Sequence, residues 1–134
     1  MESFKIVVLC LSGLALFYAS SMRLINPHKA IFLQTYVENS QKTVESDTDL
    51  INEIRGVGAV MFLGGVIILL GTLIPDFRRS SFVVAVVIFA GVALGRFISF
   101  GLDGMPNTAV VRAAIVEIAL SALNIFCLVN ILRS

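Results

Sequence analysis

The sequence predicts an all-α integral membrane protein, a four-helix bundle with a short interfacial helix between the first and second spans. The 134-residue chain is 57% hydrophobic and only 14% charged, with a mean hydropathy of +0.95. A domain that folds in water carries about a quarter charged residues, so this chain has too little charge to cover its surface there. The apolar residues also gather into four segments, each near the ~20 residues that a helix needs to cross hydrocarbon.

The four predicted spans cover residues 4–24, 54–74, 81–102 and 110–132, and together they form one domain, residues 1–134. The first span resembles a signal peptide, because Lys5 precedes an apolar run. The bulky Phe17, two residues before Ala19, suits cleavage poorly, and the apolar run continues beyond it. We therefore expect this segment to remain as a span.

The long polar stretch between the first two spans begins with Asn26 and Pro27, a typical helix cap and first helical residue. Apolar residues then recur at helical spacing up to Val37. The stretch has too few apolar residues to cross a bilayer, so it predicts an amphipathic helix, residues 27–37, at the membrane surface.

The two short connections contain residues that end and begin helices. In PDFRRSS, Pro75 ends the second span, and either serine can cap the third. In DGMPNT, Asp103 and Gly104 form a turn, and Asn107 or Thr108 caps the last helix.

Four spans place both termini on the same side of the membrane, and positive charge indicates which side. The number of lysines and arginines at or beyond the ends of the spans is nearly equal on the two sides, four on the side of the termini and five on the other. Arg78 and Arg79, however, lie together in the shortest connection, on the side of the termini. This compact pair favours cytoplasmic termini.

Two opposite charges lie at matched depth in the last two spans. Arg96 lies about six residues, or ~9 Å, inside the end of the third span, and Glu117 about seven residues, or ~10 Å, inside the start of the fourth. An unpaired charge in hydrocarbon costs several kcal/mol. We therefore predict that the two side chains form an ion pair across neighbouring helices.

Further polar residues follow at helical spacing or near the same membrane side, and they define a predicted ligand-binding or structural polar cluster. Its members are Glu53, Arg55, Arg96, Ser99, Asp103, Glu117 and Asn124. One hypothesis is a structural clasp between Arg96 and Glu117. Another is a cavity at the loop end lined by Arg55, Arg96, Asp103 and Glu117, since this many polar groups need water or a ligand as partner.

Gly91 and Gly95 form a GxxxG pattern just before Arg96. Small residues let helices approach closely in a membrane. The pattern predicts that this pair marks the tightest contact of the third span, against the glycines of the second.

Other site classes lack support in the sequence. Cys10, Cys127 and His28 have neither the spacing nor the neighbours of a metal site, and no motif indicates a cofactor. A net charge of +1 gives no reason to expect nucleic acid as a partner.

The segments NEIRGVGAVMFLGG (residues 52–65) and GRFISFGLDGMP (residues 95–106), together with Glu117, resemble a bacterial family of small four-span proteins. The family is domain of unknown function 4345, and it is distantly similar to DoxX-like membrane proteins. The resemblance implies a four-helix bundle in the bacterial inner membrane but no reaction. It also implies that the polar cluster, Asn124 apart, is the signature of the family.

The leading functional hypothesis is a non-enzymatic membrane protein. Its partners would be the lipid bilayer and either an amphiphile, such as a lipid or quinone, or a membrane protein whose assembly it assists. One alternative is a small membrane enzyme or redox-associated subunit that uses Glu117 or Asp103 as an acid–base group. The other is a proton-coupled carrier.

Overall fold

The computed structural model describes residues 1–27 and 48–133, and within these ranges it contains four long helices. They are α1 (Glu2–Ile25), α3 (Thr48–Leu73), α4 (Arg78–Leu102) and α5 (Thr108–Arg133). A 3-10 turn, η4 (Pro75–Phe77), precedes α4. Each long helix is sufficiently apolar to cross a membrane, which confirms the prediction of an all-α membrane protein. The predicted surface helix, apart from its first residue, lies outside the described residues.

Most helix boundaries follow the residues that predicted them. Pro75 follows the end of α3, as expected. The Asn107 side chain accepts a hydrogen bond of 2.9 Å from the backbone N–H of Val110 at the start of α5. Gly104 has a φ of +95°, which glycine adopts without the strain of a side chain.

The predicted serine cap of the third span is wrong. The Arg78 backbone N–H bonds the Pro75 carbonyl, so that η4 leads directly into α4. Ser81 therefore lies inside α4, where it is fully buried. Its hydroxyl donates a hydrogen bond of 2.6 Å to the Ile67 carbonyl of α3.

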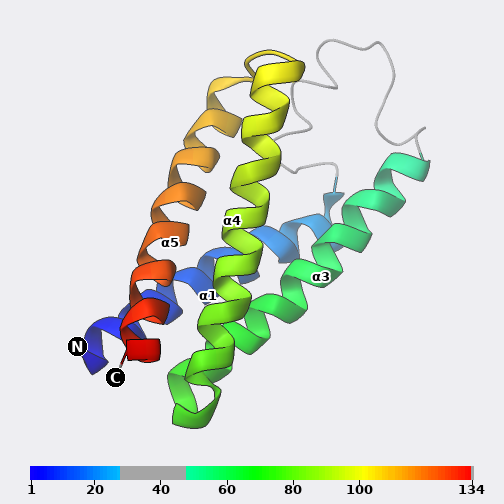
Figure 1. Cartoon of the computed structure of the whole chain (residues 1–134). Coiled ribbons are helices and arrows are strands. Elements are labelled where there is room, and N and C mark those ends of the chain that lie inside the picture. The colour runs from blue at the N-terminus through cyan, green and yellow to red at the C-terminus, as the bar shows by residue number, and fades with distance from the viewer. Residues whose placement is uncertain (28–47, 134) are drawn as a thin grey trace.

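The two ends of the helix bundle differ in how closely the helices pack. Figure 1 shows α4 and α5 side by side, with both chain termini at one end, here called the terminal end. At that end Glu2 accepts hydrogen bonds from Arg78 and, at 3.1 Å, from Lys5. The opposite end, here called the loop end, contains the end of α1, the start of α3 and the α4–α5 turn. There α3 diverges from α4 (Figure 1).

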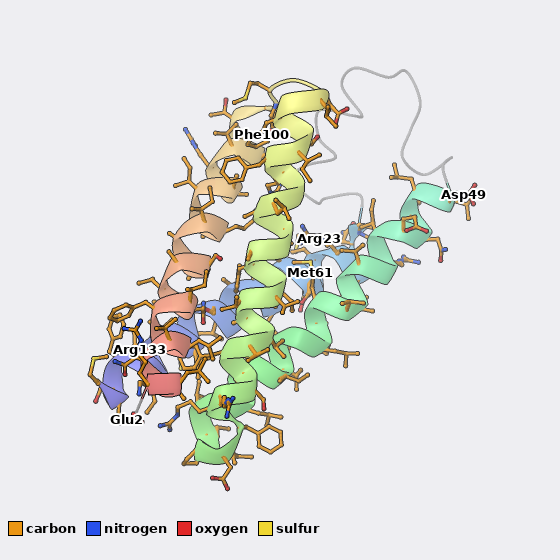
Figure 2. All side chains as sticks on the ribbon, in the orientation of Figure 1. Glu2, Arg23, Asp49, Met61, Phe100 and Arg133 are labelled. Carbon is orange, nitrogen blue, oxygen red and sulfur yellow. The ribbon has the colours of Figure 1, made fainter. Side chains whose placement is uncertain are left out.

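The hydrophobic core lies in the terminal half. It consists of Val8, Leu9, Leu16, Ile68, Phe82, Ala85, Phe89, Leu120 and Cys127. α1 packs mainly on α3, and α4 packs on both α3 and α5, whereas α1 and α5 touch little. Large apolar side chains also point outward along the helices (Figure 2), as expected of surfaces that face lipid.

The predicted role of the GxxxG pair is wrong. Gly91 and Gly95 are exposed, and a Cβ atom added at either would meet nothing within 4 Å. The reason is the divergence of α3 from α4 toward the loop end (Figure 1), which leaves Gly91 beside an open groove between the two helices.

The closest glycine contacts involve α3 instead. A Cβ atom on Gly58 would lie 2.9 Å from the Arg23 side chain of α1. One on Gly71 would lie 2.4 Å from Ser81 Oγ of α4. The glycines of α3 therefore let both neighbouring helices approach it closely.

These contacts predict different effects on stability for two matched glycine-to-alanine substitutions. Gly71→Ala should lower the free energy of unfolding by about 1–3 kcal/mol, because Ser81 must move and its bond to Ile67 breaks. Gly95→Ala should cause no loss, because space is open around it. Thermal unfolding in detergent measures both, and equal stability of the two variants would contradict this packing.

Candidate functional site

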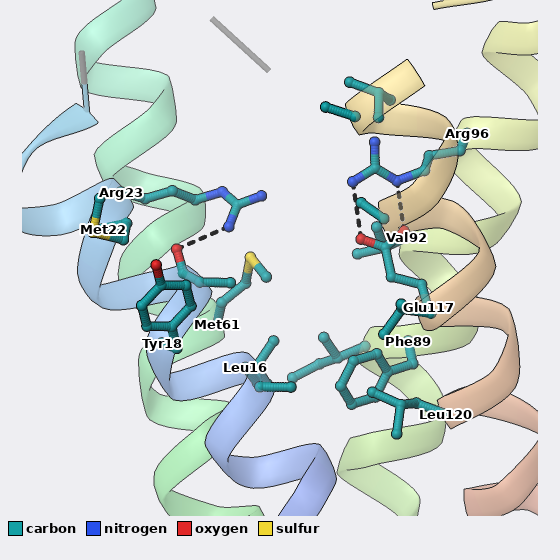
Figure 3. Close-up of a pocket in the computed structure, with 17 residues that line it drawn as sticks. Leu16, Tyr18, Met22, Arg23, Met61, Phe89, Val92, Arg96, Glu117 and Leu120 are labelled. Carbon is teal, nitrogen blue, oxygen red and sulfur yellow. Dashed lines mark hydrogen bonds and ion pairs between the residues drawn. The ribbon is translucent and has the colours of Figure 1, made fainter. Parts of the chain in front are cut away.

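Arg96 and Glu117 form a two-pronged ion pair between α4 and α5. Arg96 Nε donates to Glu117 Oε2 at 2.5 Å, and Arg96 Nη2 donates to Oε1 at 2.9 Å (Figure 3). The side chains are only 19% and 16% exposed, respectively. The ion pair predicted from matched depth is therefore confirmed.

This geometry reduces the cost of placing charges inside an apolar bundle. Both carboxylate oxygens accept a charge-assisted hydrogen bond, and the pair as a whole carries no net charge. Two parallel bonds also fix the relative orientation of the side chains. The pair therefore sets the register of α4 against α5 at this depth.

A cavity of about 440 Å³ lies beside the pair, between α1 on one side and α4 and α5 on the other. Its lining is almost entirely apolar and includes Met61 of α3. Leu16, Phe89 and Leu120 line it where it borders the core. The cavity thus occupies the loop half of the bundle, and the packed core occupies the other half.

Small side chains account for much of this space. The cavity is lined by Ala15 and Ala19 of α1 and by Ala109 and Ala113 of α5. Larger residues at these positions would fill the region where α1 and α5 touch little. Alanines that would otherwise be typical of a helix contact therefore border a cavity here.

Arg23 also lines the cavity, and the sequence analysis missed this role. Its Nη1 donates to the Ala19 carbonyl at 3.0 Å. Figure 3 shows its guanidinium reaching from α1 toward the wall that carries Arg96 and Glu117. It lies close enough to both for electrostatic interaction. Its spacing of four and seven residues from Ala19 and Leu16 was the available signal, since such residues share a helix face.

Two residues predicted to line the cavity do not. Arg55 is exposed, because α3 turns the face of Ile54 and Gly58 inward. Asp103 is exposed where α4 ends, and it accepts a hydrogen bond of 2.7 Å from the exposed Ser99. The cavity prediction is therefore wrong for Arg55 and Asp103.

The remaining predicted residues lie apart from the ion pair. Glu53 is exposed, in a shallower groove between α3 and α4. Asn124 is fully buried beyond the cavity, where its Nδ2 donates to Ser12 Oγ and to the Leu120 carbonyl, both at 2.7 Å. Its Oδ1 has no hydrogen-bond partner among the described residues. The structure therefore divides the predicted cluster into several places.

Within the described ranges, no three histidine, cysteine, aspartate or glutamate side chains come together, so these residues offer no set of metal ligands. Both cysteines are free thiols. The chemistry that this region offers is hydrogen bonding and charge attraction beside an apolar surface.

A double-mutant cycle tests the ion pair. Arg96→Leu and Glu117→Leu should each destabilise the protein by several kcal/mol, toward the ~3–5 kcal/mol of a broken buried pair, because each leaves one buried charge alone. The double variant should lose less than the sum. Unfolding in detergent measures this, with the exposed Arg112→Leu as control. Strict additivity would show that the pair contributes no coupling.

Comparison with known proteins agrees with this architecture. No curated protein and no solved structure matches the chain. The family model described as Domain of unknown function (DUF4345) matches residues 4–128, which include all but the ends of the four helices. The chain therefore belongs to the family of domain of unknown function 4345.

Proposed function

We propose that the protein binds an amphiphile from the bilayer in the cavity at the loop end, without catalysing a reaction on it. The cavity itself is the observation that carries this proposal. Small-molecule sites typically enclose ~300–1,000 Å³ of mostly apolar surface with a few polar groups. A cavity of about 440 Å³ with Arg23, Arg96 and Glu117 on its walls fits that description.

The order of polar and apolar groups along the cavity supports a lipid-like ligand. Arg23 lies two residues from the end of α1, near the membrane interface. Leu16 lies seven residues earlier, which is ~10 Å deeper along the same helix. A molecule with its polar end outward and its apolar end inward, as in one leaflet of a bilayer, matches this order.

The alternatives receive less support. A membrane enzyme that uses Glu117 as an acid–base group would need its carboxylate to exchange a proton with a substrate. Both carboxylate oxygens are instead engaged by Arg96. No observation on the described residues favours a proton-coupled carrier or assistance to a partner membrane protein.

The location of the ligand follows from the proposed orientation. We propose, as expected from the sequence, that the protein lies in the bacterial inner membrane with its termini on the cytoplasmic side. The loop end then lies toward the periplasmic side. The ligand would therefore come from the outer leaflet of that membrane.

Native mass spectrometry tests the proposal. Protein extracted in mild detergent should retain an amphiphile at a ratio near one to one. Ala113→Phe should abolish this retention, because a phenyl ring would occupy part of the cavity. Ala119→Phe, on an exposed position of the same helix, serves as the matched control. Unliganded wild-type protein, or equal retention by both variants, would count against the proposal.

A further inference from the structure

A groove between α3 and α4 lies beside the cavity. It encloses about 580 Å³ and forms where α3 diverges from α4 toward the loop end (Figure 1). Its lining includes Val57 and Val60 of α3 and Val87 and Gly91 of α4. All four residues are exposed. The groove is therefore open to the surface of the bundle that faces lipid.

Single side chains separate the groove from the cavity. Met61 of α3 and both Ile88 and Val92 of α4 line the two spaces at once. These three residues, here called the partition, are half-buried. Figure 3 shows Met61 and Val92 where they border the cavity. Because the same side chains border both spaces, the cavity and the groove are direct neighbours.

The cavity and the groove also cover a similar depth. Along α3 the groove extends from Glu53 to Met61, eight residues or ~12 Å, which is close to the length of the cavity along α1. Their inner ends coincide on α4, at Val87 in the groove and at Ile88 in the cavity. There Ile88 packs directly against Gly64 of α3, where an added Cβ atom would overlap it. The two spaces therefore run side by side from the loop end to one inner limit.

We infer that the ligand is a lipid with two hydrocarbon chains, one in the cavity and the other in the α3–α4 groove, so that the partition of Met61, Ile88 and Val92 lies between the chains. This inference rests on the proposed function, and it names the chemical class of the ligand. The two chains of such a lipid leave one polar head group and run side by side to a similar depth, as the two spaces do.

The link between the chains explains why the second chain adds affinity. Within a bilayer no hydrophobic effect drives a chain against the protein, so binding depends on how well the chain packs. Once one chain occupies the cavity, the head group holds the other beside the groove at a high effective concentration. The molecule also loses its translational freedom only once for both contacts. A lipid with two chains should therefore bind better than an amphiphile with one.

Native mass spectrometry of the delipidated full chain in mild detergent tests the inference. Dioleoylglycerol and monooleoylglycerol, added together in equal amounts, differ by one chain. The protein should retain the two-chain lipid at least about tenfold more, a modest part of the gain that linked contacts can give. Dioleoyl and monooleoyl phosphatidylglycerol should show the same preference, because it depends on the number of chains and not on the head group.

A variant of the groove then connects the preference to this structure. In Gly91→Phe the phenyl ring would occupy the groove, and a Cβ atom there meets no atom of the described residues within 4 Å. The preference for two chains should disappear in this variant. Gly101→Phe lies at an equally open position of α4 outside both spaces, and it should keep the wild-type preference. Each variant is measured in the same lipid mixture, so the change in the ratio isolates the groove.

The outcomes separate the inference from the proposed function. If the protein carries no amphiphile as extracted and retains none of the four lipids, the proposed function fails. If it carries an amphiphile but binds one-chain and two-chain lipids equally or neither, the two-chain class is wrong. The class is also wrong if Gly91→Phe keeps the preference. Should Gly91→Phe fail to fold, Val60→Trp narrows the groove from the exposed side of α3 and replaces it.

Discussion

The loop half of the bundle depends on one ion pair. Arg96 and Glu117 lie within helices that are otherwise apolar, and a single charge there would cost several kcal/mol. Because both carboxylate oxygens are bonded, α4 and α5 cannot slide or rotate past each other without losing those bonds. The same constraint holds one guanidinium beside the cavity, which connects the stability of the fold to the candidate site.

A second constraint is the packing of α1 against α3. Glycines of both helices allow close approach, as where Gly65 lies against the backbone of Gly13 and Phe17. In the terminal half, Val8, Leu9 and Leu16 of α1 join the core. Toward the loop end, α1 stays with α3 and touches α5 little. Alanines face the resulting space, so the bundle is packed at one end and hollow at the other.

The sequence predicted features that depend on neighbouring residues or on depth. These features include span length, the end of a helix before Pro75, the cap at Asn107 and the matched depth of Arg96 and Glu117. It did not predict that α3 diverges from α4 at the depth of Gly91 and Gly95, because a GxxxG pattern gives a spacing but not the path of the neighbouring helix. It also missed Arg23 as a lining residue. An arginine near a helix end can point inward or outward, and that choice depends on how α1 lies relative to α5, which distant contacts determine.

The most direct test of this account is to locate a ligand tail inside the protein. Crystals grown with a fatty acid that carries bromine on its terminal carbon would reveal that carbon by anomalous scattering. The account predicts a bromine peak at the inner end of the cavity, among Leu16, Phe89 and Leu120, with the carboxylate toward the loop end. Bromine found only on the outer, lipid-facing surface, with side chains filling the cavity, would contradict it.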